Sequence, residues 1–377
     1  MPACIPDTEN ASPVTPRWHL TAVWTRCVVC AICLLSATET LHSQTAEDSL
    51  KFEYFPFALY DTDVGFGAGA NAVLRSALGS RERFELMLFA SSKGERLLRL
   101  DFSMEAEELR QGTEYDFAVD LRFEYDKMIQ TSFFGTGSGS RYEDKESYVH
   151  EPVLLQAVFS RGFTPTLVAQ LQMKFKRMWS YGFEETSRLR DRADNATTSD
   201  LSSLALRVRH DTRDNTLHTS AGHVLQGEVE QALSLTRHGS VWTRLGVTAH
   251  WYRMLAGMVF ATRGMLQHIT GDAVPVQQML AVGGNRTLRG QPENRFLDRA
   301  SAVGNAELRI PLYRRLGLLL GVDAGAVSAT LPGVLDARWS AAPVIGLRFA
   351  FDTFIVRGDV GRSSDAVGVY FNVGQVF

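Results

Sequence analysis

The stretch Tyr115-Asp-Phe-Ala-Val-Asp-Leu-Arg-Phe-Glu-Tyr-Asp126 alternates apolar with mostly polar side chains, and this alternation decides the fold. Successive side chains of a β-strand point to opposite faces, so this stretch predicts a strand with one wholly apolar face. Strands of soluble proteins usually run to about five or six residues, and this one is longer. A long strand with an uncharged face is typical of a membrane β-barrel, where one face meets lipid and the other a polar lumen.

The same alternation recurs along the chain from about residue 50. Sixteen segments of this kind can be counted in the sequence: 50–58, 62–75, 83–93, 96–107, 114–127, 147–162, 167–181, 201–214, 222–236, 240–255, 257–270, 302–312, 317–328, 343–352, 354–362 and 366–377. Most reach the roughly 9–11 residues that a strand needs to cross a bilayer. The sequence therefore predicts an all-β fold, a transmembrane antiparallel β-barrel of 16 strands.

The first residues have a different composition from the rest. Arg17 and Arg26 precede the apolar run Cys27–Leu35, and small or polar residues follow it, which is the pattern of a secretory signal peptide. We expect a signal peptide over residues 1–46, with cleavage between 37 and 46, and an exported barrel over residues 47–377. All four cysteines lie in the first 33 residues, so the exported barrel is expected to contain none.

Charge and motif content exclude several functions. The 377 residues have a formal net charge of −3, which argues against a nucleic-acid partner. The nine histidines form no H-E-x-x-H spacing, and the sequence has no G-x-S-x-G or phosphate-binding loop motif. We therefore expect no enzyme activity, no cofactor and no metal site.

Links between the segments differ in length. Short links such as 162–166 and 218–222 are expected on the periplasmic side, together with both ends of the barrel. Longer polar links, 134–147, 183–200 and 271–301, are expected on the outer side, because outer-membrane barrels show this asymmetry.

The segment Gly283-Gly284-Asn-Arg-Thr-Leu288-Arg289-Gly290 resembles the Arg-Gly loop motif of the BamA-like family, the bacterial surface antigen or outer-membrane assembly-factor barrels. The resemblance covers essentially all of the expected barrel and is densest over residues 201–377. It implies an extracellular loop that folds into the barrel and whose Arg289 contacts Asp323. The chain departs from the family at Leu288 and Gln291, where a β-branched and an aromatic residue are usual. It also has no segment that resembles the family's periplasmic POTRA domains.

Strand phase gives an independent indication of what faces the lumen. Alternation places several charged residues of the last strands opposite apolar ones. The resulting set of expected lumen partners is Glu307, Arg309, Asp323, Arg348, Arg357 and Asp359, beside the loop-lock motif Gly283, Gly284, Leu288, Arg289 and Gly290. In the last segment, Val367, Val369, Phe371, Val373 and Phe377 are expected to share the outward face. Tyr370, Phe371, Val373 and Phe377 resemble the C-terminal signal by which such barrels are recognised for insertion.

The resemblance implies a barrel that assists the insertion or translocation of proteins or lipids at the bacterial outer membrane. Its opening would be a weak seam between the first and last strands, since Pro56 removes a backbone donor and Gly368 and Gly374 weaken the last strand. Expected partners are outer-membrane lipids, the barrel-assembly machinery for its own insertion, and a separate POTRA-bearing or chaperone protein. A passive pore, a structural barrel and a surface antigen remain alternatives.

Overall fold

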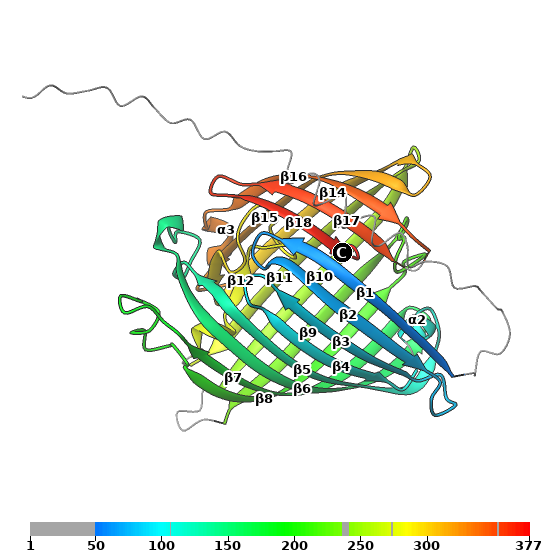
Figure 1. Ribbon diagram of the computed structural model, residues 1–377, viewed down its shortest axis with the longest axis horizontal. Coiled ribbons are helices and arrows are strands. Elements are labelled where there is room, and N and C mark those ends of the chain that lie inside the picture. Colours follow the sequence, from blue (N-terminus) through cyan, green and yellow to red (C-terminus); the bar gives the residue numbers. More distant parts are fainter. Residues whose placement is uncertain (1–49, 106, 236–240, 273, 353) are drawn as a thin grey trace, which may run out of the picture. The chain divides into compact units, whose positions relative to one another are not determined.

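A computed structural model describes residues 50–105, 107–235, 241–272, 274–352 and 354–377. The expected signal peptide, residues 1–46, lies outside the described residues. Sixteen strands of the described residues hydrogen-bond to their neighbours in an antiparallel ring and close into a barrel (Figure 1). The predicted fold class and strand number are confirmed. Within the described residues, no helix combines the length and the apolar composition needed to cross a bilayer.

The wall is built from two runs of consecutive strands. The first run is β1 (Lys51–Asp61), β2 (Gly65–Arg75), β3 (Arg83–Ser91), β4 (Arg96–Ser103), β5 (Tyr115–Phe133), β6 (Glu146–Thr164), β7 (Leu167–Tyr181), β8 (Thr198–Asp211), β9 (Gly222–Ser234), β10 (Val241–Leu255) and β11 (Met258–Gly271). The second run is β14 (Ala300–Tyr313), β15 (Leu316–Ser328), β16 (Ser340–Ala350), β17 (Ile355–Arg362) and β18 (Val367–Val373).

The links hold the remaining elements. They are α2 (Glu107–Arg110), η1 (Tyr142–Asp144), η2 (Val276–Gln278), β12 (Leu280–Val282), β13 (Phe296–Asp298) and α3 (Gly333–Asp336). The strands β12 and β13 pair with each other and lie outside the ring of the wall.

Two strands are longer than the alternation indicates, β5 by five residues and β6 by three. β5 and β6 each contain 19 residues, against the predicted ranges 114–127 and 147–162. Their extra pairing, for example Phe133 with Glu146, lies beyond a register irregularity between Met128 and Thr131. A bulge of this kind shifts side chains between faces, so the strand continues where the alternating pattern stops.

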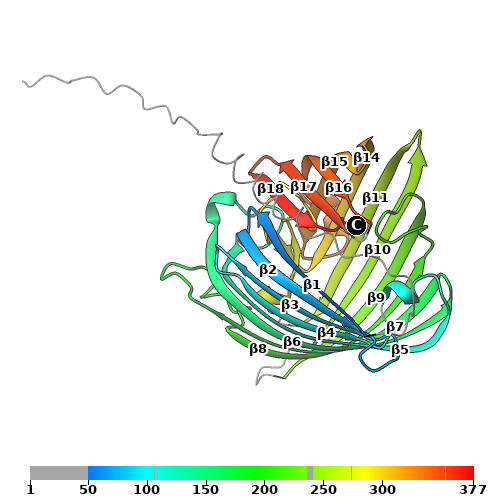
Figure 2. The same cartoon turned by 45° about the vertical axis from the view of Figure 1, so that its right-hand side comes forward.

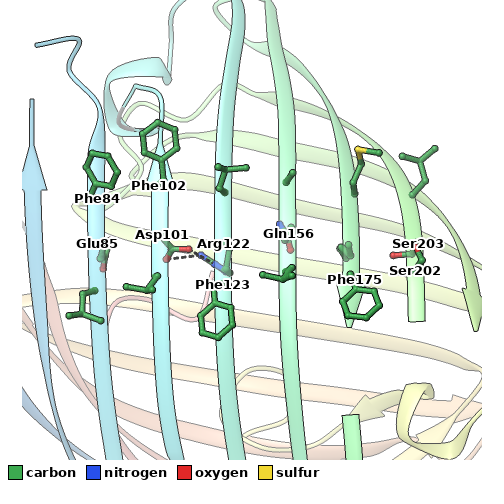
Figure 3. Close-up of a pocket in the computed structure, with 18 of the residues that line it drawn as sticks. Phe84, Glu85, Asp101, Phe102, Arg122, Phe123, Gln156, Phe175, Ser202 and Ser203 are labelled. Atoms are coloured by element: carbon green, nitrogen blue, oxygen red, sulfur yellow. Dashed lines mark hydrogen bonds and ion pairs between the residues drawn. The ribbon is translucent and has the colours of Figure 1, made fainter. Parts of the chain in front are cut away.

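The two faces of the wall have the expected chemistry. Along one belt of the barrel, Phe84, Phe102 and Phe123 occupy positions of one parity, whereas Asp101 and Arg122 occupy the other (Figure 3). Arg122 Nε donates to Asp101 Oδ1 at 2.6 Å. Similar cross-strand ion pairs join Arg99 to Glu124 and Arg207 to Glu228. The lumen of this half of the barrel is therefore lined by locally neutralised charges.

Candidate functional site

The link between β11 and β14, residues 272–299, folds into the barrel; we name it the plug loop. Its hairpin β12–β13 packs against the wall through an apolar cluster that includes Val282, Leu288 and Phe296 from the loop. Leu288 is fully buried there against wall residues such as Val303 and Val327. The apolar side of the loop therefore positions the residue that follows, Arg289.

Arg289 binds Asp323 of β15 through both its backbone and its side chain. Its Nε and Nη2 donate to the two carboxylate oxygens at 2.7 Å and 2.9 Å, and its backbone N donates to Oδ2 at 3.0 Å. Both side chains are completely buried. Burial alone would lower the pKa of Arg289, but the bond to Asp323 and the charge of Glu307 raise it above its usual value. A forked donor on a carboxylate is a strong and directional contact in a dehydrated site.

The same guanidinium reaches two further carboxylates. Arg289 Nη2 lies 2.8 Å from Glu307 Oε1 of β14, and Nη1 lies 3.2 Å from Asp359 Oδ2 of β17. Each of these acids also holds an arginine of the wall. Glu307 pairs with Arg309, and Asp359 with Arg348 and Arg357. The structure thus brings together all six expected lumen partners around Arg289; we name this set, with Arg263, the charge cluster.

The arginines of the charge cluster outnumber its carboxylates, and neutral oxygens accept some of their hydrogen bonds. The charge cluster holds five arginines against three carboxylates, and Arg263 of β11 was not expected in it. Arg263 Nε donates to Asn305 Oδ1 at 3.0 Å, and Asn305 Nδ2 in turn donates to Asp323 Oδ1 at 2.7 Å. Arg263 also donates to the carbonyl of Arg286 in the plug loop. Loop carbonyls therefore satisfy donors that the carboxylates leave free.

The backbone of the plug loop lies directly against the backbone of β17. A Cβ added to Gly361 would lie 2.5 Å from the carbonyl carbon of Arg289, and one added to Gly290 would lie 2.7 Å from that of Gly361. Only residues without side chains permit this approach. Tyr370 of β18 closes the contact, since its hydroxyl accepts from Gly290 N at 3.2 Å.

The far side of the plug loop is tied to other links. Gln291, in place of the family's aromatic residue, is buried and donates to Ser340 Oγ at 3.1 Å. Arg295 forms an ion pair of 2.9 Å with Asp365 and lies over the ring of Phe134 at 5.1 Å from its centre. These contacts join the plug loop to the start of β16 and to the β5–β6 and β17–β18 links. No group of three or more metal-binding side chains is placed to hold an ion within the described part of the chain.

Comparisons with known proteins agree with this geometry. The model of the Omp85 superfamily domain matches residues 66–360. The chain belongs to the Omp85 superfamily. The barrel is similar to BamA from Haemophilus ducreyi lacking POTRA domains 1–3, with a TM-score of 0.64 and 13% identity over 88% of this chain and 71% of that one. It is also similar to CdiB from Escherichia coli (TM-score 0.64, 11% identity, 87% and 63%) and from Acinetobacter baumannii (0.56, 12%, 88% and 60%). None of the curated proteins matches the chain.

The seam of this Omp85 barrel lies between β1 and β18. Only two residue pairs, Tyr60 with Phe371 and Asp61 with Tyr370, join these strands among the described residues, whereas β1 and β2 share eleven. Thr62 adds a bond from its N to Val369 O at 3.1 Å. Figure 2 shows the end of β1 beside β18, with most of β1 extending beyond it. The edge of β1 from Lys51 to Leu59 is thus left without a described ladder partner.

The prediction that Phe377 faces outward is wrong. β18 ends at Val373, and at Gly374, with φ of +92°, the chain turns into the lumen. The Phe377 ring centre lies 5.8 Å from that of His250, and its carbonyl oxygen accepts from Arg309 Nη2 at 2.9 Å. Arg309 of the charge cluster donates a hydrogen bond to this oxygen, which lipid cannot do. Whether Tyr370, Phe371, Val373 and Phe377 act as an insertion signal stays a prediction.

Proposed function

We propose that this chain is an outer-membrane barrel that assists the insertion or translocation of proteins or lipids by opening at the β1–β18 seam. The observation that carries the proposal is the two-pair seam beside the free edge of β1. Separating these strands breaks few hydrogen bonds, and the exposed edge can pair with another strand. Membership of the Omp85 superfamily and the likeness to the BamA and CdiB barrels support it.

Strand length also supports an opening at this place. β17 has 8 residues and β18 has 7, fewer than the roughly 9–11 that span a bilayer. A short wall forces the bilayer to thin locally, which lowers the barrier for an inserting segment. The plug loop, held by β14, β15 and β17, lies on the same side of the barrel as the seam.

The proposal includes an orientation and partners. Both ends of the barrel would face the periplasm, and the plug loop would enter from the outer side. Outer-membrane lipids surround the wall, the barrel-assembly machinery inserts it, and a separate POTRA-bearing or chaperone protein delivers substrates. The activity is non-catalytic, because it needs only strand pairing and lipid displacement.

Site-specific photo-crosslinking tests the seam. A photoreactive residue replaces the exposed Tyr54 of β1, and the matched control replaces the outward-facing Leu225 of β9, which has ladder partners on both sides. We expect envelope proteins or lipids in transit to be captured at position 54 and not at 225. Equal adducts at both positions, or none at 54, would contradict the proposal.

Conductance distinguishes the passive-pore alternative. The lumen holds a polar cavity of about 320 Å³ on the β3–β8 side, with the plug loop against the other wall. A barrel closed in this way is expected to give small, intermittent currents in a planar bilayer. A large and steady current from the purified chain would favour a pore over an insertion factor.

A further inference from the structure

The outer surface carries a basic and aromatic patch at one rim of the barrel, where β8 ends, β9 begins and β10 ends. It consists of His210, Thr212, His223, Trp251 and Arg253, and we name it the back patch. Strand register places His223 directly beside Trp251, and His210 beside Leu225 on the same face. The three strands and Thr212, the first residue after β8, thus bring polar and aromatic side chains together at this rim.

These side chains face away from the lumen. His210 shares its parity on β8 with Leu204, Leu206 and Val208, which are all exposed on the outer surface. Arg207 and Arg209 of the opposite parity point to the lumen, where Arg207 pairs with Glu228. The back patch therefore lies at the edge of the apolar belt that contacts acyl chains, at the level of lipid headgroups.

The two histidines and the threonine form a hydrogen-bonded chain. His210 Nδ1 lies 3.1 Å from His223 Nε2, and His223 Nδ1 lies 3.0 Å from Thr212 Oγ1. If Thr212 donates to His223 and His223 donates to His210, then His210 presents its Nε2–H at the open end. An anion beside His210 favours this arrangement, because the outermost group is then a donor.

Arg253 supplies a permanent positive charge two residues from Trp251. Arg253 is exposed and has no ion pair among the described residues, unlike Arg161 on β6 at the same rim, which pairs with Asp116. Trp251 is 43% exposed, and its ring stands edge-on to Phe260. An exposed tryptophan beside a free arginine is typical of a side-chain pair that anchors a strand at the lipid headgroups.

The outward face of the three strands carries no competing acid around the back patch, and Asp211 points to the lumen side, where it pairs with Arg213. The outward positions of β8 from Leu204 to Thr212, of β9 from His223 to Gln231 and of β10 from Thr243 to Arg253 carry no carboxylate. The back patch therefore has an uncompensated positive charge next to a wide apolar surface. That combination complements a lipid with an anionic headgroup.

We propose that the back patch binds the phosphate of an anionic phospholipid, with Arg253 and His210 as donors and Trp251 packed against the glycerol region. The inference rests on the barrel standing in a bilayer and is independent of the seam's activity. In the ring of strands, β8 and β9 are each eighth from the seam, so the patch lies directly opposite the opening. A lipid held there anchors the wall that stays closed while β1 and β18 separate.

Tryptophan quenching by brominated lipids tests the proposal. The full chain is reconstituted in phosphatidylcholine vesicles that contain a small fraction of brominated phosphatidylglycerol or, in parallel, of brominated phosphatidylcholine. The Trp251 signal is the difference between the wild type and Trp251→Phe. We expect phosphatidylglycerol to be enriched about fivefold beside Trp251, as basic residues near a bilayer surface enrich anionic lipid.

Variants separate a built site from general surface charge. Arg253→Gln and His210→Phe should each reduce the preference for phosphatidylglycerol, whereas Arg161→Gln at the same rim should retain it. Resistance of the folded barrel to unfolding in detergent confirms that each variant is folded. Equal quenching by the two lipids in the wild type, or an equal loss in Arg161→Gln, would overturn the proposal.

Discussion

One side chain, Arg289, joins the plug loop to three strands of the wall. Its guanidinium contacts Asp323, Glu307 and Asp359, which come from β15, β14 and β17. Burial of three carboxylates is unfavourable unless each has a cationic partner. Glu307 and Asp359 keep arginines of the wall when Arg289 is removed, but Asp323 loses its ion-pair partner and leaves a buried charge behind.

We predict that Arg289→Ala weakens docking of the plug loop by about 3–5 kcal/mol, the usual cost of breaking a buried ion pair. Arg289→Lys should give an intermediate loss, since the charge stays but the forked geometry does not. Hydrogen exchange of the loop amides measures the change. The exposed Arg362→Ala is the control, and unchanged protection in Arg289→Ala would contradict the role of the contact.

Gly361 allows a second prediction that involves no charge. Gly361→Ala would place its Cβ 2.5 Å from the backbone of Arg289, so the loop must move away. We expect a destabilisation of docking of about 1–3 kcal/mol, typical of overpacking. Gly358→Ala on the same strand is the matched control, because its Cβ would lie 3.9 Å from Phe371. The two variants should differ clearly in loop protection by hydrogen exchange.

Residues differ in how far the sequence predicts their contacts. Alternation and the family motif together place Arg289, Asp323 and the other charges on the lumen side. Arg263 and Gly361 are different, because Arg263 donates to the carbonyl of Arg286 as well as to Asn305, and Gly361 approaches the backbone of Arg289. Backbone atoms are the same in every residue, so no sequence pattern indicates which of them will approach.

At the scale of elements, two turns make docking of the plug loop depend on pH. The pKa of Asp63 in the β1–β2 turn is raised to about 7, mainly by burial and to a smaller extent by the charge of Asp61. The pKa of Glu95 in the β3–β4 turn is also raised to about 7, mainly by burial and to a smaller extent by the charge of Asp126. Both turns face Glu293 of the plug loop, whose pKa is raised by burial. Like charges from three links thus meet at one place.

We predict that the plug loop docks more tightly at pH 5 than at pH 8. The raised pKa values mean that these carboxyls bind protons more tightly when docked, so their stabilisation is complete below the ordinary carboxyl pKa. It is lost as the pH rises through about 7. Hydrogen-exchange protection factors of the plug-loop amides, corrected for intrinsic exchange, should be at least tenfold higher at pH 5 than at pH 8. This ratio corresponds to about 1.4 kcal/mol of docking free energy. Glu293→Gln should reduce this dependence; a variant with an unaltered pH profile would contradict it.

The inward turn after Gly374 gives an element-scale prediction for the seam. Continued register would pair Ala58 with Val373, but the Phe377 ring, which packs against His250 and under Arg309, holds the tail after β18 in the lumen. In a Phe377→Ala background, a disulfide between Ala58→Cys and Val373→Cys should form faster than in the parent. The pair Tyr60→Cys and Phe371→Cys, already in register, should be unaffected. An equal rate in both backgrounds would show that the tail does not hold β18 away.

Elements were predictable where alternation is regular. Strands such as β7 (167–181) agree with the sequence, whereas β5 and β6 exceed it because a bulge interrupts the pattern. Alternation also placed Phe377 outward, since a period of two assumes that the strand continues. The turn at Gly374 and the arginines that bind the tail lie far apart in the sequence, so the local pattern cannot reveal them.

At the scale of the whole molecule, the barrel has two differently built halves. The β2–β10 wall neutralises its charges between neighbouring strands, such as Asp101 with Arg122. The β11–β18 wall has such pairs as well, for example Arg348 with Asp359, and adds Arg289 of the plug loop, which binds Asp323 and Asp359 over sequence separations of 34 and 70 residues. The number of strands can be predicted from alternation in both halves. The difference in how the two halves neutralise their charges cannot, because it depends on where the plug loop docks.

The shared guanidinium has a consequence for the way the loop moves. When the loop withdraws, Glu307 keeps Arg309 and Asp359 keeps Arg348 and Arg357, but Asp323 loses the arginine with which it pairs. The forked bond between Arg289 and Asp323 has no stable halfway geometry. The motion should therefore be all-or-none. Single-channel records of this barrel are expected to jump between two discrete levels, with dwell times that shorten in Arg289→Lys, rather than to drift through a continuum.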